Sequence, residues 1–309
     1  METERANLLS NLMEFGKEDF LMQVTTRWLK IISERLEKAW AAQAIPLKMF
    51  EEKELTKPII EHKISLCTTC MGRLMDLEKT FPKNIEDNIG YKNVEFILLN
   101  YNSKDNLEEW ARDTLKDLIK SKIVVYVKTE EPQFYTMAHS RNVAFKIASG
   151  DIVTNVDADN FTGPGFANRL NLLSNQAFHA GFKNVFVKSF RSTHGRIGFW
   201  RKEFIDILGG YDEMFIGYGH DDRDIVYRAM QLGFTIVRFG GEESSRLKSK
   251  VNKVANYDPD GIDKNWRYTE QLNKIISYSN LMVGNLVANR GKEWGKAKLT
   301  KNFTDEVIL

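Results

Sequence analysis

The chain is poor in the residues that hold small secreted folds together. Its 309 residues include only two cysteines, Cys67 and Cys70, and six prolines. Two thiols cannot build a disulfide framework, which favours a reducing compartment, and their C-x-x-C spacing has no second pair to complete a zinc site. We therefore interpret both cysteines as buried thiols on a strand, with redox chemistry as the minor alternative.

Long apolar runs and a large excess of one charge are also missing. No run approaches the roughly 18 apolar residues of a membrane-spanning helix, and the acid-containing start lacks the order of a secretory signal. We therefore expect a cytoplasmic protein without a membrane span. A formal net charge of +2 does not by itself indicate nucleic-acid binding. Two basic clusters, within residues 246–253 and 290–301, are interpreted as solvated faces or as contacts to phosphate or an acidic acceptor.

Helical spacing of apolar residues dominates the first part of the chain. Residues 1 to about 45 predict two helices divided near Gly16, and Pro46 ends the second. These helices could pack on a catalytic core, form an oligomer or hold a partner. We divide the chain into an N-terminal helical segment (1–62), a catalytic domain (63–248) and a C-terminal helical extension with a basic tail (249–309).

From residue 63 onward, short β-rich runs alternate with helical stretches. Such alternation predicts an α/β fold with a mostly parallel, Rossmann-like central sheet flanked by helices. The predicted strands are residues 64–68, 94–99, 123–127, 150–156, 185–190 and 194–201. The predicted helices are residues 74–81, 107–119, 137–148, 202–208 and 266–287. Because ligands bind at the carboxyl ends of parallel strands, one crevice is expected to collect Thr68, Arg73, Asn102, Asp105, Asp157 and Asp159.

Two acidic clusters stand out. Asp157 and Asp159 follow an apolar strand one residue apart, a spacing that suits a divalent cation but also occurs in simple turns. Asp221, Asp222 and Asp224 begin a helix, where the helix dipole stabilises negative charge. For Asp224 we favour the plain role of a first-turn acid.

The order of these motifs resembles the nucleotide-sugar glycosyltransferases of the GT-A fold, close to family 2 and to the galactosyltransferase-like C-terminal module. The family's A-R-N appears as Ser140-Arg141-Asn142, its G-D strand as Gly150-Asp151, and its D-x-D as Asp157-Ala158-Asp159. Residues 209–228 match its G-G-x-D-E-x-F-x-G-W-G-x-E-D-x-D-L-x-x-R block. The resemblance spans residues 63 to 240.

Three departures from the family pattern bear on the site. Tyr218 replaces a Trp and Asp221 replaces a Glu. The family often supplies a metal-binding His after the acidic block, yet no histidine follows His220. Water or a residue of 242–244 could take that place. His194 could do so only if its loop reached the site.

The resemblance implies an inverting, metal-dependent transfer from a nucleotide diphosphate sugar, with UDP as the expected nucleotide. Asp159 would bind Mn²⁺ or Mg²⁺, and Asp157 would face the ribose or a metal-bound water. Asp222 would be the base and Asp221 would orient hydroxyl groups. Arg141 would position the diphosphate or Asp157, unless it forms only a structural ion pair. Donor-binding candidates are Thr68, Arg73, Asn102 and Asp105.

The acceptor stays open at this point. A glycan, a protein side chain, a small molecule and a hydroxylated DNA base are all compatible with the motifs. A non-catalytic nucleotide-sugar-binding module is a second alternative. Nucleotidyl transfer is disfavoured because the loop at residues 68–73 has one glycine rather than a glycine-rich phosphate loop. Trp200 is interpreted as a core residue, or less favourably as a wall for a sugar ring.

Overall fold

The structure, a computed structural model, describes residues 27–36, 38, 58–179, 181, 184–187, 197–238, 245–249, 252, 254–258 and 265–309. The chain divides into two compact units, residues 1–39 and 40–309. In the first unit, residues 27–36 are helical and Leu29 is buried, within the second helix that the sequence predicts. The first predicted helix lies outside the described residues. None of the described helices has the length and apolar character needed to cross a bilayer.

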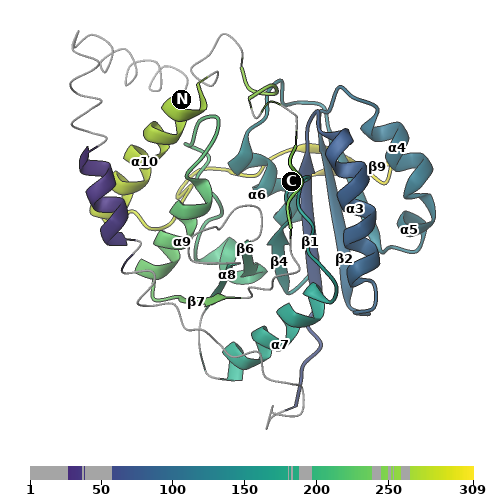
Figure 1. Ribbon diagram of the computed structural model, residues 1–309, viewed down its shortest axis with the longest axis horizontal. Coiled ribbons are helices and arrows are strands. Elements are labelled where there is room, and N and C mark those ends of the chain that lie inside the picture. Colours follow the sequence, from purple (N-terminus) through teal and green to yellow (C-terminus); the bar gives the residue numbers. More distant parts are fainter. Residues whose placement is uncertain are drawn as a thin grey trace. The chain divides into compact units, whose positions relative to one another are not determined.

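The second unit is built on a sheet with the strand order β7-β5-β6-β4-β1-β2-β3-β8-β9. Its centre consists of β1 (Ile64–Cys70), β2 (Val94–Tyr101), β3 (Val124–Thr129) and β4 (Ile152–Asn155), which pair in parallel (Figure 1). Each strand is separated from the next in sequence by helix, as a parallel crossover requires. The predicted α/β class with a mostly parallel centre is confirmed.

Both edges of the sheet depart from this parallel pattern. β6 (Ile197–Trp200) runs antiparallel to β4 and to β5 (Asn184–Val187), and β7 (Thr235–Arg238) completes that edge. At the other edge, β8 (Lys298–Lys301) and β9 (Asp305–Ile308) form a hairpin whose first strand pairs with β3. The sequence predicts only a basic tail here. Four-residue strands rich in charge carry too weak an alternation to be recognised.

Helices cover the two faces of the sheet. α3 (Leu74–Asn88), α4 (Leu107–Thr114) and α7 (Phe166–His179) share one apolar cluster with the even-numbered side chains of β1. α6 (Met137–Ile147) packs on β1, β2 and β4. The predicted helix 107–119 is divided at Leu115 into α4 and α5 (Lys116–Lys120). The remaining helices are α8 (Arg201–Asp206), α9 (Asp221–Gln231) and α10 (Trp266–Met282), the last ending five residues earlier than predicted.

Both cysteines are free thiols buried on β1, as predicted. Burial raises the pKa of Cys70 to about 12 and that of Cys67 well above its usual value. Because the thiolate is the reactive form of cysteine, these side chains act as apolar core residues rather than as nucleophiles.

A tight turn before α9 sets the position of that helix. Arg228 of α9 donates to the carbonyl oxygens of Leu208 at 2.8 Å and Gly210 at 2.9 Å. Gly209 has a φ of +65°, and a Cβ on it would overlap the carbonyl oxygen of Ala288. Only glycine satisfies both the left-handed backbone and the close approach.

Replacing Gly209 should therefore lower the free energy of unfolding by more than backbone strain alone would. We expect Gly209→Ala to lower the free energy of unfolding by about 2 to 4 kcal/mol, which combines left-handed strain with a clash against rigid backbone. Gly233→Ala is the matched control, because Gly233 is also left-handed (φ +83°) but has no atom within 4 Å of the new Cβ. It should lose only about 1 kcal/mol. Urea unfolding measures both, and equal losses would contradict the crowding argument.

Candidate active site

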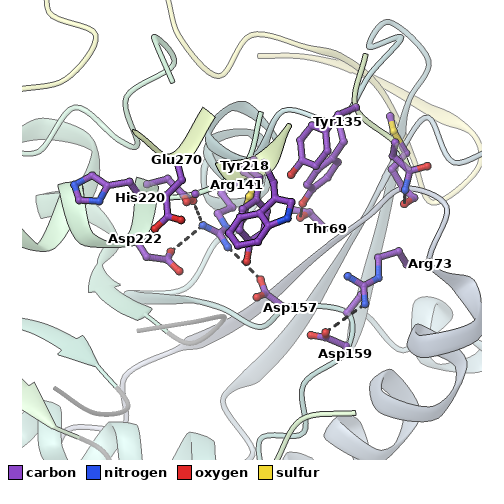
Figure 2. A pocket seen from close by; sticks show the side chains of 18 of the residues that line it. Thr69, Arg73, Tyr135, Arg141, Asp157, Asp159, Tyr218, His220, Asp222 and Glu270 are labelled. Atoms are coloured by element: carbon purple, nitrogen blue, oxygen red, sulfur yellow. Dashed lines mark hydrogen bonds and ion pairs between the residues drawn. The ribbon is translucent and has the colours of Figure 1, made fainter. Parts of the chain in front are cut away.

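A cleft of about 310 Å³ lies at the carboxyl ends of β1 and β4 and at the start of α9 (Figure 2). Asp157 and Asp159 from the first acidic cluster line it together with Asp221 and Asp222 from the second. Of the six strand-end residues expected in one crevice, Arg73, Asp157 and Asp159 line this cleft, and the acidic start of α9 joins them there.

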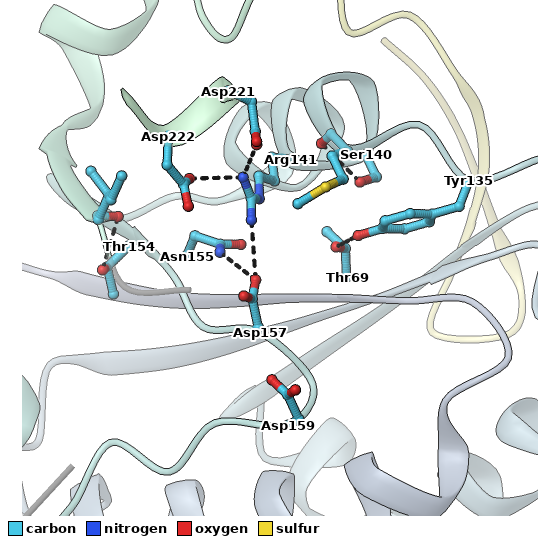
Figure 3. A network of polar contacts seen from close by, with 12 residues as sticks. Thr69, Tyr135, Ser140, Arg141, Thr154, Asn155, Asp157, Asp159, Asp221 and Asp222 are labelled. Atoms are coloured by element: carbon cyan, nitrogen blue, oxygen red, sulfur yellow. Dashed lines mark hydrogen bonds and ion pairs between the residues drawn. The ribbon is translucent and has the colours of Figure 1, made fainter. Parts of the chain in front are cut away.

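A single buried arginine joins the two acidic clusters (Figure 3). Arg141 of α6 is 1% exposed. Its Nη2 donates to Oδ1 of Asp157 at 3.2 Å, and its Nη1 donates to Oδ1 of Asp222 at 2.8 Å and also to Oδ2 of Asp221. Asn155 donates a further hydrogen bond to Asp157 at 2.8 Å. We call these five residues the Arg141 network.

The residue after Arg141 fixes the loop that leads to the second acidic cluster. The side chain of Asn142 accepts from the Tyr211 amide at 2.8 Å and donates to the Tyr211 carbonyl at 2.9 Å. It also donates to Glu213 at 2.8 Å. Asn142 is fully buried, so these bonds are not exchanged with water. One turn of α6 therefore positions both the loop and the carboxylates that follow it.

The first acidic cluster is a turn rather than a continued strand. β4 ends at Asn155, and the amide of Asn160 donates to the carbonyl of Asp157 at 2.9 Å. Two side chains of α3 hold this turn in place. Thr80 donates to the carbonyl of Ala158 at 2.6 Å, and Asn84 donates to the carbonyl of Asn160 at 2.9 Å. The two aspartates consequently reach different arginines, although both face the cleft.

Asp159 is paired with two arginines from distant parts of the chain. Its Oδ2 accepts from Arg246 Nε at 2.9 Å and from Arg73 Nη2 at 3.3 Å. Arg73 also donates from both Nε, at 3.1 Å, and Nη2, at 2.6 Å, to Oδ2 of Asp76. The loop that carries Arg246 is held close, since Leu247 donates its amide to the carbonyl of Asp159 at 2.8 Å. Arg246 is half-exposed and Asp159 is buried.

The carboxylates in this part of the cleft share a small number of guanidinium groups. Within the described residues, the five carboxylates of Asp76, Asp157, Asp159, Asp221 and Asp222 form ion pairs with the three guanidinium groups of Arg73, Arg141 and Arg246. Burial alone would raise the pKa of Asp157, but Arg141 and the Asn155 hydrogen bond outweigh it and hold that pKa below its usual value.

The donor atoms at the first acidic cluster fit a hard divalent cation. Within the described residues, no hydrogen bond reaches Oδ2 of Asp157 or Oδ1 of Asp159, so each carboxylate keeps one oxygen for a ligand. Across the same residues, no group of three or more His, Cys, Asp or Glu could hold a metal by itself. Mg²⁺ and similar ions commonly take one or two carboxylates and complete their shell with phosphate and water. A cation here would therefore complete its coordination shell with water and with the oxygens of a phosphate-bearing ligand.

Three predicted donor-binding residues lie away from the lining of the cleft. Thr68 is on the α3 face of β1, and its neighbour Thr69 lines the cleft instead, because adjacent strand residues face opposite sides. Asn102 donates to two carbonyl groups of the loop after β3. Asp105 accepts from the Leu74 amide at 2.9 Å at the start of α3. Arg73 alone of these four lines the cleft.

Other candidates have structural surroundings. Asp224 forms a buried ion pair with Arg228 at 2.7 Å, in agreement with a first-turn role. Trp200 packs against the core and meets His62 edge-on at 4.8 Å. His220 has a φ of 71°, and its ring lies against Tyr278 at 5.2 Å. His194 and residues 242–244 lie outside the described residues.

Sequence reasoning missed several residues that line the cleft. Tyr135 is hydrogen-bonded to Thr69 at 2.7 Å, and Tyr257 packs edge-on against Tyr135 at 6.1 Å. Trp266 and Glu270 contribute from α10. Arg246 belongs to the basic cluster within residues 246–253, for which contacts to phosphate are one interpretation of the sequence. Nothing in the local sequence connects Tyr135, Tyr257, Trp266 or Glu270 with the acidic motifs.

Comparison with known proteins gives a consistent picture. The sequence model of glycosyl transferase family 2 matches residues 65–213, and that described as the N-terminal domain of galactosyltransferase matches residues 176–251. No curated protein sequence matches the chain.

Two solved structures share the fold. The mannosyltransferase PcManGT from Pyrobaculum calidifontis, solved with GDP-Man and Mn²⁺, has a TM-score of 0.56 at 16% identity over 85% of this chain and 74% of its own. TarS of S. aureus (residues 1–349), solved with UDP-GlcNAc, has a TM-score of 0.51 at 11% identity over 63% of this chain and 62% of its own.

The Arg141 network should have a large and pH-dependent effect on stability. We expect Arg141→Gln to lower the free energy of unfolding at pH 7 by about 3 to 5 kcal/mol, because the buried carboxylates of Asp221 and Asp222 and the partly exposed carboxylate of Asp157 lose their shared counter-ion. In the wild type, the depressed pKa of Asp157 contributes stability above its unfolded pKa of 3.8, and that contribution is lost as the pH falls through the folded value. The deficit of the variant should therefore be largest at neutral pH and smaller below about pH 4.

Urea unfolding at pH 7 and at about pH 3, below the unfolded pKa of the carboxylates, measures this difference. Arg112→Gln is the control, since Arg112 forms an exposed ion pair with Glu108. The free energy of unfolding of Arg112→Gln should be lower than that of the wild type by about 1 kcal/mol or less. Similar losses in the two variants, or a deficit independent of pH, would contradict the role assigned to Arg141.

Arg246 and a divalent cation should compete for Asp159. We expect Arg246→Gln to bind Mn²⁺ about twofold to fivefold more tightly in the absence of donor, the range set by the strength of a partly exposed ion pair. Electron paramagnetic resonance of free Mn²⁺ measures the binding. Lys248→Gln, an exposed cation of the same loop, is the matched control and should change little. Unchanged or weaker binding by Arg246→Gln would rule out the competition.

Proposed function

We propose that the chain is a GT-A glycosyltransferase of the family 2 type and that it is an inverting, metal-dependent enzyme that transfers a sugar from a UDP-linked donor to an acceptor hydroxyl. A nucleotide diphosphate sugar is supported by the relatives of known structure, which were solved with GDP-Man and UDP-GlcNAc. The choice of UDP, the inversion and the metal requirement are the parts of this proposal that need experiment.

The observation that carries the proposal is the meeting of two acidic clusters in one cleft. Asp157 and Asp159 close β4, while Asp221 and Asp222 open α9 some 60 residues later, and Arg141 contacts a member of each cluster. A transferase needs a charged site for the leaving diphosphate beside a base for the acceptor. The two clusters supply groups suited to these two tasks.

The acceptor end of the reaction is assigned to Asp222. As the acceptor oxygen attacks the anomeric carbon, its proton passes to the carboxylate of Asp222, and the bond from that carbon to the diphosphate oxygen breaks. A single carboxylate is sufficient, because inversion proceeds without a covalent sugar intermediate. Arg141 holds Oδ1 of Asp222 and so fixes the orientation of this carboxylate in the cleft. Asp221, on the same guanidinium, positions hydroxyl groups.

The leaving-group end is assigned to Asp157, Asp159 and their neighbours. Asp159 and Asp157 would hold Mn²⁺ or Mg²⁺, which supplies Lewis-acid stabilisation of the negative charge on the departing diphosphate. Arg73 and Arg246 already lie at Asp159, so their guanidinium groups are placed to bind phosphate oxygens. Thr69 and Tyr135 line the same cleft and are candidates for contacts to the nucleoside. Thr68, Asn102 and Asp105 would act indirectly, through the loops that they hold.

Two variants separate donor binding from transfer. We expect UDP-sugar with Mn²⁺ to raise the melting temperature of the wild type, since a ligand stabilises the folded state that binds it. Asp159→Ala should lose the Mn²⁺-dependent part of this shift because it removes a cation ligand. Asp222→Asn should keep the shift but lose transfer by a factor of about 10² to 10⁴, the usual contribution of a general base. Thermal-shift assays across a panel of nucleotide sugars and a UDP-release assay measure both quantities.

Asp206→Asn, an exposed aspartate of α8, serves as the control and should resemble the wild type in both assays. Full turnover by Asp222→Asn would refute its assignment as the base. A wild type that no nucleotide sugar stabilises, with or without Mn²⁺, would refute the donor assignment and support a different ligand for the cleft.

A further inference from the structure

Helix α10 is fixed to the loop that leads into the second acidic cluster. The hydroxyl group of Thr269 donates to the Tyr218 carbonyl oxygen at 3.0 Å and accepts from the Tyr218 amide at 3.2 Å. The Asn273 side chain donates to the carbonyls of Ile216 and Gly219 at 2.9 and 2.8 Å and accepts from the Ile216 amide at 3.0 Å. Thr269 and Asn273 are almost completely buried. These hydrogen bonds give α10 one defined position against the cleft.

Two side chains on the same face of α10 reach the cleft. Trp266 and Glu270 are four residues apart, so they lie one above the other on the helix surface, and both line the cleft. The indole of Trp266 meets the ring of Tyr218 edge-on, with centroids 6.0 Å apart. Glu270 packs on Gly219, where an added Cβ would lie only 3.0 Å from its Cγ. Both side chains are therefore held by their neighbours.

Their contacts place them beside the segment that leads into the second acidic cluster. Trp266 meets Tyr218 and Glu270 packs on Gly219, two positions before Asp221. Figure 2 shows Glu270 and Asp222 on one side of Asp157 and the Arg73–Asp159 ion pair on the other. A diphosphate bound at Arg73 and Asp159 would therefore leave the region around Asp222, Tyr218 and α10 for the acceptor.

The chemistry of these side chains selects a class of acceptor. We propose that Trp266 and Glu270 form the acceptor subsite and that the acceptor bound there is a sugar residue of a neutral glycan. This inference rests on the proposed function, which assigns the base to Asp222. A pyranose ring has an apolar C–H face that packs on an indole, and its hydroxyl groups donate to a carboxylate, which only accepts.

The same residues disfavour an acceptor in DNA. A duplex would bring its phosphates close to Glu270, Asp221 and Asp222, and like charges at short range repel. Four arginines line the cleft, but Arg73, Arg141 and Arg246 are paired with aspartates. A surface that binds the DNA backbone presents several cations directly to the phosphates. A neutral sugar meets no such repulsion.

The test measures binding of simple sugars to the full chain. The probes are the methyl glycosides of glucose, galactose, mannose and N-acetylglucosamine, titrated by saturation-transfer difference NMR in the presence of UDP and Mn²⁺. We expect the wild type to bind at least one of them, and Trp266→Ala and Glu270→Gln each to weaken that binding at least tenfold. Trp266→Phe should weaken it less, because a smaller aromatic ring still offers a face. Trp28→Ala, an exposed tryptophan outside the cleft, should bind like the wild type.

The outcomes separate this inference from the proposed function. Binding of UDP is measured on the same wild-type sample. Absence of UDP binding would contradict the donor assignment, and UDP binding without binding of any methyl glycoside would overturn the acceptor subsite alone. Glycoside affinities unchanged in Trp266→Ala and Glu270→Gln would overturn it as well. So would tighter, salt-sensitive binding of a short DNA duplex that displaces the glycosides.

Discussion

The site depends on one buried positive charge. Arg141 lies on a helix that the central sheet positions, and its guanidinium contacts carboxylates from two segments that are distant in sequence. Taking four charged groups out of water is costly, and the cost is offset only when their geometry satisfies each of them. The relative placement of the two acidic clusters is therefore tied to this arginine. Its neighbour Asn142 adds a second constraint by holding the loop at Tyr211.

The ion pairs of Asp159 bear on the leaving-group end of the proposed reaction. Arg73 and Arg246 both donate to Oδ2 of Asp159, and Arg246 is half-exposed on a loop from beyond the matched acidic block. Under the proposed function, a cation would replace these contacts and the two guanidinium groups would bind the diphosphate. The C-terminal part of the chain thus contributes to the cleft: Arg246, Asn252 and Tyr257 line it together with Trp266 and Glu270 of α10, and β8 pairs with β3.

Much of the fold follows from local patterns in the sequence. Buried parallel strands read as short apolar runs, and the helices between them carry amphipathic spacing, so the β1-to-β4 region could be predicted. The hairpin of β8 and β9 could not, because its strands are four residues long and mostly polar. The division of the predicted helix 107–119 at Leu115 was also invisible, since no glycine or proline marks it.

The sequence by itself determined which chemical groups are available: two acidic clusters, an arginine that precedes both of them in sequence, and strand ends that bring acidic residues to one edge of the sheet. Tertiary structure alone decided how they are used. It selected Thr69 rather than Thr68 for the cleft, directed Asp157 and Asp159 to different arginines, and brought in Arg246, Trp266 and Glu270. The contacts of Asp159 with Arg73 and Arg246, and that of Tyr218 with Thr269, join residues 51 to 87 positions apart. Over such a separation, periodicity and motif spacing carry no information about which side chains meet.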